Sequence, residues 1–202
     1  MESPKQPGAG PESTGTEEEH EALRQDGPRI YVASLSDYNA GILHGEWIEA
    51  DQPPEDLHEA TQAMLQLSPS PDAEEFAIHD FEGFGHYEVE EYDSLEWISR
   101  VASGITEQGL AFSAWAEQCD QEQDALDRFE DAYRGDWMSV QDYAEELVAD
   151  LGWEQMLEKA CPEPLASYFH LDIEGFARDL ELGGDITAVR HSSGVWIFEG
   201  QF

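Results

Sequence analysis

The chain has 202 residues, of which 46 are Asp or Glu and only 9 are Lys or Arg, so its formal net charge at pH 7 is −37. This charge excludes nucleic acid and anionic membranes as direct ligands, because their phosphates would be repelled, and it favours basic proteins or cations as partners. A hydrophobic content of 40%, with 11% aromatic residues, is higher than in disordered acidic chains and predicts folded cores.

Residues 1–28 are rich in Pro, Gly, Ser, Thr and Glu, which predicts a disordered acidic leader. No signal-peptide pattern occurs in this leader, and no stretch of the chain approaches the roughly 18 apolar residues of a membrane span. Cys119 and Cys161 fit neither a disulfide framework nor a metal site, so we expect free thiols and a cytoplasmic protein.

The first folded segment, residues 29–91, is predicted to have the order β-β-α-β. Its strands are rich in β-branched and aromatic residues, and they are expected at 29–35, 44–50 and 74–82. Residues 36–41 read as a turn-rich loop. A helix is expected after Pro53 and Pro54, because proline is tolerated at a helix start.

Residues 92–136 are predicted to form a helical middle domain. Asp93 and Glu96 have the spacing of a capping box, which predicts a helix start at that point. Two further helices are expected at 110–118 and 124–133; in the second, the apolar residues share one face and the acids lie away from it.

Residues 137–202 are predicted to form a mixed α/β domain. Ser139 is expected to cap a helix over 140–152, and a second helix over 172–184 ends at a Gly-Gly pair. Residues 186–198 read as a short hairpin. The sequence therefore predicts an α+β fold built from three small domains, 29–91, 92–136 and 137–202.

The search for catalytic or metal-binding motifs predicts none. His44, His79 and His86 belong to no metal-ligand signature, and close acid pairs such as Glu90–Glu91 are expected by chance in so acidic a chain. Cys119 lies in an acidic context that disfavours a thiolate. We expect no catalytic residue, no metal and no cofactor.

The acidity extends over all the folded segments, since the leader carries −5 and residues 29–202 carry the remaining −32. Adaptation to high salt would enrich acids in the same way. The alternative is imitation of DNA, which carries two charges per base pair, so that −32 corresponds to roughly 16 base pairs. The expected DNA-mimic surface consists of Glu88, Glu90, Glu91, Asp93, Glu96, Glu107, Glu117, Asp120, Glu122, Asp124, Asp127, Glu130, Asp131, Asp142, Glu145, Glu146 and Asp150.

Several long segments resemble the ArdA antirestriction family, in the family's order: residues 29–50, 77–85, 139–152 and 168–200. The resemblance implies an inhibitor of type I restriction–modification enzymes that imitates DNA and occupies the groove of the methyltransferase core. Such proteins are carried largely by mobile genetic elements, have no catalytic residues, and have three small domains in an elongated, curved arrangement. The leader at 1–28 departs from the family pattern.

The resemblance also implies a homodimer with contacts in the C-terminal domain. Apolar candidates for these contacts are Phe169, Phe176, Leu180 and Trp196. The family associates one segment with antirestriction, and in this chain it comprises Leu171, Asp172, Ile173, Glu174, Gly175, Phe176, Ala177, Arg178, Asp179, Leu180, Glu181, Leu182, Gly183 and Gly184.

Two other functions stay open at this point. An acidic modulator or chaperone of another basic DNA-binding protein would capture its partner without relieving restriction. An enzyme adapted to salt would be active and more stable in molar salt, and it would inhibit no restriction enzyme.

Overall fold

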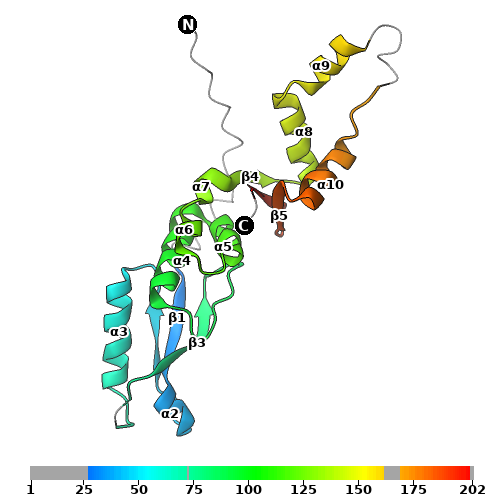
Figure 1. The fold of residues 1–202 in the computed structure, drawn as a ribbon. Coiled ribbons are helices and arrows are strands. Elements are labelled where there is room, and N and C mark those ends of the chain that lie inside the picture. Colours follow the sequence, from blue (N-terminus) through cyan, green and yellow to red (C-terminus); the bar gives the residue numbers. More distant parts are fainter. Residues whose placement is uncertain (1–26, 72, 162–168, 201–202) are drawn as a thin grey trace, which may run out of the picture. The chain divides into compact units, whose positions relative to one another are not determined.

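A computed structural model describes residues 27–71, 73–161 and 169–200 (Figure 1), so the leader expected to be disordered lies almost wholly outside the described residues. The fold is mixed α/β, with helices and two three-stranded antiparallel sheets, which confirms the predicted α+β class. Contacts group the described residues into two compact units, 27–129 and 130–200. The division into three domains stays a prediction.

The first sheet contains β1 (Arg29–Ser34), β2 (Gly45–Glu49) and β3 (Phe76–Glu82), in the order β2-β1-β3. Alternating side chains of β1 point to opposite faces, so Ile30 and Val32 are buried on one side. Helix α3 (Pro54–Gln66) packs against β1 and β2 and buries Leu57. The predicted strand–strand–helix–strand order is confirmed.

The turn-rich loop predicted at 36–41 is wrong, because helix α2 (Leu35–Asn39) occupies most of it. Ser34 is its N-cap, and the hydroxyl accepts a hydrogen bond from the Asp37 amide at 3.3 Å. The Asp37 carboxylate is buried and accepts bonds from the Ser68 hydroxyl (2.6 Å) and the Ser70 amide (3.2 Å). Burial raises the pKa of Asp37, but these bonds outweigh it and hold the pKa below its usual value.

The first unit contains three further helices, α4 (Leu95–Gln108), α5 (Leu110–Gln118) and α6 (Gln123–Leu126), and α7 (Phe129–Ala132) spans the point in the sequence where the second unit begins. Ser94, rather than Asp93, caps α4, since its hydroxyl accepts from the Trp97 amide at 3.1 Å. The single helix predicted over 124–133 is also wrong. It breaks after Leu126, and the Ala125 carbonyl there accepts a hydrogen bond from the Trp115 indole at 3.0 Å.

The second unit contains β4 (Tyr133–Trp137), α8 (Val140–Asp150), α9 (Trp153–Ala160), α10 (Ile173–Gly183), β5 (Ile186–Arg190) and β6 (Val195–Glu199). Its sheet has the order β4-β6-β5. The predicted Ser139 cap, both predicted helices and the hairpin are confirmed. A cluster that includes Tyr143, Ala144, Leu180 and Ile197 forms the core.

Sequence reasoning missed β4 and α9. Gly135 and Asp136 are residue types that disfavour strands, and every residue of β4 is half-buried, so no apolar run marks this strand. Gly152, with a φ of 66°, ends α8, and helix α9 begins directly after it. Helix α9 buries none of its residues. None of the helices in the described ranges is long and apolar enough to cross a membrane.

We expect Gly104→Ala to destabilise the first unit. A Cβ at residue 104 of α4 would lie 2.2 Å from the ring of Phe112, which is buried in α5. Because the packed core cannot accept the added carbon, the free energy of unfolding should fall by about 1–3 kcal/mol in urea denaturation. Thr106→Ala, at an exposed position of the same helix, is the control and should change it by less than about 0.5 kcal/mol. Equal effects of the two substitutions would contradict this account of the α4–α5 contact.

Candidate functional site

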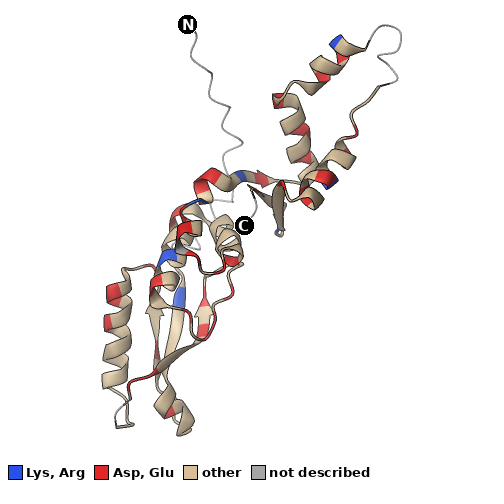
Figure 2. Cartoon of the chain, in the orientation of Figure 1, with Lys and Arg blue, Asp and Glu red and all other residues tan. Residues whose placement is uncertain are grey.

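The candidate functional site is a surface of carboxylates. All the residues that the sequence assigned to the DNA-mimic surface are exposed except Asp93. They lie on the segment 88–91, on helices α4 to α8 and on the turns between these helices. Figure 2 shows acidic residues over elements of both units and only scattered basic ones.

Few of these carboxylates have a basic partner, since residues 29–202 contain 39 acidic and only 7 basic residues. Within the predicted surface, Asp127 pairs with Arg100. Glu96 lies 2.9 Å from the Nε2 atom of His58, and this bond holds the pKa of Glu96 below its usual value. The surface therefore carries a large excess of negative charge.

Helix α8 shows how local structure directs the charge outward. Ser139 caps the helix, and Tyr143, Ala144 and Val148 face the core. Asp142, Glu146 and Asp150 recur every four residues on the exposed side, with Glu145 beside them, so successive carboxylates rise by about 6 Å along the helix axis. Packing of one face therefore fixes a row of charges on the other.

The segment 88–92 forms one side of an acidic hollow of about 500 Å³. Its lining consists of Glu88, Val89, Glu90, Glu91, Tyr92 and Glu117. The Glu88 amide donates a hydrogen bond to a carboxylate oxygen of Glu117 at 3.0 Å, which joins the segment to α5. Tyr92 is 72% exposed, and the negative charge of Glu91 raises its pKa. Carboxylates around an exposed ring suit the guanidinium or ammonium group of a partner.

Asp93 is only 4% exposed, so its assignment to the mimic surface is wrong. One carboxylate oxygen accepts bonds from the Tyr87 hydroxyl (2.7 Å) and the Glu90 amide (3.0 Å), and the other accepts from the Gln121 amide group (2.6 Å). Trp97 in turn donates to the Tyr87 hydroxyl at 2.7 Å. Burial raises the pKa of Tyr87, and Asp93 raises it further. Asp93 therefore acts inside the fold and positions the acidic segment.

Aromatic rings lie beneath the acidic segment. Phe84, Tyr87 and Trp97 are buried, and adjacent rings lie within 6.4 Å of each other. Val89 is also buried, while Glu88 and Glu90 on either side of it are exposed. The rings hold this irregular backbone in place and leave its carboxylates in water.

The segment 171–184, which the resemblance associates with antirestriction, forms α10 and its two ends. Asp172 caps the helix by accepting from the Gly175 amide at 2.9 Å, and Gly184, with a φ of 76°, ends it. Ala177 and Leu180 are buried in the core, and Ile173, Phe176 and Leu171 are half-buried. The exposed residues of the segment are Asp172, Glu174, Arg178, Asp179, Leu182 and Gly183.

Two of the four predicted dimer residues belong to the core of the second unit. Leu180 is part of the core cluster, and the buried Trp196 ring stacks on the His191 ring with 4.3 Å between centroids. Phe176 packs against the same cluster and against Trp153. Phe169 is 51% exposed, so its side chain is accessible to a partner, while dimerisation itself stays a prediction.

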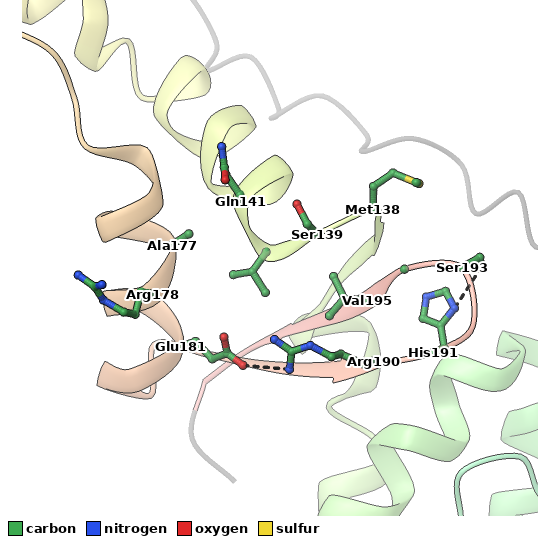
Figure 3. Close-up of a pocket in the computed structure, with 12 residues that line it drawn as sticks. Met138, Ser139, Gln141, Ala177, Arg178, Glu181, Arg190, His191, Ser193 and Val195 are labelled. Carbon is green, nitrogen blue, oxygen red and sulfur yellow. Dashed lines mark hydrogen bonds and ion pairs between the residues drawn. The ribbon is translucent and has the colours of Figure 1, made fainter.

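A second hollow, of about 520 Å³, lies between α10, the start of α8 and the β5–β6 turn (Figure 3). Its lining includes three basic side chains, Arg178, Arg190 and His191, and two of them lie beside acidic groups. Arg190 pairs with Glu181 at 3.5 Å, and His191 lies 2.9 Å from Asp136. These two pairs balance part of the positive charge that lines the hollow.

Two of the histidines weighed for catalysis have contacts within the first unit. His44 contacts the Met64 carbonyl at 2.8 Å, and His79 packs edge-on against Tyr38. Burial raises the pKa of the Cys119 thiol to about 12, which makes it a poor nucleophile. Within the described residues, no group of three His, Cys, Asp or Glu side chains is placed to hold a metal ion.

Sequence reasoning missed Gln121, which bonds to Asp93 across 28 residues of sequence. Gln121 and Asp120 both have positive φ values, 59° and 44°, a region that glycine usually occupies. No local sequence signal marks such a turn when it lacks glycine. Only the tertiary contact identifies this residue.

Residues 30–194 match the family described as antirestriction protein (ArdA). No curated protein matches the chain.

We expect Asp93→Asn to destabilise the fold although the two side chains have the same shape. Three donors point at the Asp93 carboxylate, and an asparagine would place its own NH₂ donor against at least one of them. The free energy of unfolding should fall by about 1–3 kcal/mol in urea denaturation. The matched control is Glu90→Gln, an exposed carboxylate three residues away, which should be nearly silent. If Asp93→Asn were equally silent, the buried network would have no structural role.

Proposed function

Because the chain belongs to the ArdA family of antirestriction proteins, we propose that it inhibits type I restriction–modification enzymes as a mimic of B-form DNA. In this proposal the protein occupies the DNA-binding groove of the methyltransferase core. It performs no chemistry of its own, in keeping with membership of an antirestriction family rather than a family of catalysts.

The observation that carries the proposal is the exposure of the predicted carboxylates on ordered elements of both units. DNA binds its protein partners largely through phosphates, and lysine and arginine contacts release the counterions condensed around them. Carboxylates fixed on helices present the same kind of charge to the same basic groove. Residues 29–202 carry −32, the charge of roughly 16 base pairs.

Recognition by charge requires no contact with base edges. Phosphate contacts fix a protein on DNA without reading its sequence. A mimic of the phosphates should therefore inhibit type I enzymes with different target sequences. A homodimer would double the charge to that of roughly 32 base pairs, the scale of a long bipartite target.

Relief of restriction separates this function from the alternatives. Phage plating on a host with a type I system, with and without the gene, should show increased plating when the gene is present. A modulator of another basic protein would leave the plating efficiency unchanged.

We expect the affinity for a purified type I methyltransferase to fall steeply with salt. Many simultaneous charge contacts imply a loss of roughly a thousandfold or more between about 50 and 200 mM NaCl, as for DNA itself. Isothermal titration or fluorescence anisotropy at rising NaCl measures this slope, and the enzyme's own duplex target serves as the reference. A flat response would contradict occupation of a basic groove.

We expect single charge removals on the surface to be nearly silent and combined removals to abolish inhibition. An exposed ion pair contributes about 0–1 kcal/mol, so Glu145→Gln alone should weaken binding by less than about fivefold. A variant with eight glutamates changed to glutamine should lose at least about a hundredfold. These positions are Glu88, Glu90, Glu91, Glu107, Glu117, Glu122, Glu145 and Glu146.

The variant with eight substitutions needs a folding control. All eight side chains are exposed, and their neutralisation reduces self-repulsion, so thermal unfolding should occur at the same temperature or a higher one. A single glutamine substitution that abolished inhibition in a folded protein would indicate a discrete site in place of a distributed one.

A further inference from the structure

The face of the first sheet opposite to the Ile30 and Val32 side chains combines aromatic rings with carboxylates. In the register of the sheet, Tyr31 lies directly between Trp47 and Asp80, and Arg29 lies between Glu49 and Glu82. Because residues directly opposite each other point to the same side, all six side chains share this outer face.

Aromatic packing keeps this face in one conformation. The rings of Tyr31 and Trp47 lie 5.6 Å apart. The Tyr31 ring also covers Gly45, where a Cβ atom would lie 2.8 Å from it, so the absence of a side chain at residue 45 makes room for the ring. Trp47 nevertheless stays 36% exposed on an edge strand.

Exposed apolar side chains also occur in the connection between β1 and β2, residues 35–44. Tyr38 of α2 packs edge-on against His79 of β3, with 4.7 Å between centroids, and is itself exposed. Ile42 is also exposed, and Leu43 is 90% exposed. We call Tyr31, Tyr38, Ile42, Leu43 and Trp47 the aromatic face. Large apolar side chains exposed on one sheet and on the connection between its strands are typical of a contact surface for another molecule.

The chain itself shows how this face holds an arginine. The Arg29 guanidinium lies over the Trp47 ring at 4.9 Å, while two of its nitrogens donate to Glu82 at 2.8 and 2.6 Å. A ring and a carboxylate together therefore bind one guanidinium here. Tyr31 and Asp80, opposite each other in the register, offer the same pair of groups to a further arginine.

Charge decides which partner fits. No lysine or arginine occurs between Ile30 and Ser99, and Glu49 and Asp80 beside the rings are exposed. A second copy of this chain would bring the same negative charge to the contact and be repelled. DNA is repelled for the same reason. A protein surface that presents arginines among apolar side chains complements both the rings and the carboxylates.

We propose that the aromatic face is a docking surface for an arginine-bearing, partly apolar surface of the basic protein that this chain inhibits. The inference rests on the proposed function and adds a contact that DNA does not offer, since a duplex presents phosphates and no apolar side chains to the groove wall. Apolar contact is not screened by salt. This surface therefore supplies the part of the affinity that persists at high salt.

The test compares Leu43→Ser and Trp47→Ser with Leu67→Ser, a matched control at a 76% exposed position at the end of α3. Binding to a purified type I methyltransferase is measured from 50 to 400 mM NaCl. Each variant of the aromatic face should bind about tenfold more weakly at every salt concentration, with an unchanged salt slope. The Leu67→Ser variant should bind like the parent chain. Leu43 is so exposed that its removal leaves the packing intact, which separates lost docking from lost folding.

A second probe separates this inference from the proposed function. A labelled peptide of alternating arginine and leucine is titrated into the same variants at 300 mM NaCl, and sedimentation equilibrium gives their self-association. If the parent chain fails to bind the methyltransferase but the peptide distinguishes the variants, the proposed function falls and the docking surface stands. The inference is overturned if the methyltransferase binds the parent chain and the variants equally well. If the methyltransferase binds none of them, the inference is overturned when the peptide binds the parent chain and the variants equally well. Loss of self-association alone would assign the face to a second copy and also overturn it.

Discussion

Mutual repulsion among carboxylates is the constraint on which the rest of this structure depends. From Arg29 onward the chain has 39 acidic residues and only 7 basic ones, so the fold cannot neutralise its own surface charge. Such repulsion opposes any compact state. The stabilisation has to come from buried apolar and aromatic groups, such as Trp97 and Phe198, and from hydrogen bonds that do not depend on ion pairs.

The carboxylates divide into two kinds according to their surroundings. Asp37 and Asp93 are buried, and their oxygens accept bonds from hydroxyl and amide donors, so they hold turns and segments together. The others, exemplified by Glu88 and Glu90 beside the buried Val89, lie in water on a backbone that the core fixes. An inhibitor that competes by charge needs both kinds, because a flexible polyanion would lose conformational entropy on binding.

Local signals explain what the sequence predicted correctly. The Ser139 cap, the apolar spacing of α10 and its Gly-Gly end act within a few residues, and the structure confirms each. The burial of Asp93 escaped prediction because it depends on Tyr87 and on Gln121, which is 28 residues away. Strand β4 contains Gly135 and Asp136, which disfavour strands, and its place is set by pairing with β6, about 60 residues later. The exposure of the surface carboxylates was predictable from charge alone, whereas the buried contacts that hold their backbone in place were not.

Competition with DNA tests the central claim most directly. A type I methyltransferase is saturated with its labelled duplex target, and this protein is added at several fixed DNA concentrations. Occupation of the groove predicts that DNA is displaced and that the apparent Kd of the protein rises in proportion to the DNA concentration. A ternary complex, in which protein and duplex bind together with unchanged affinities, would contradict the account.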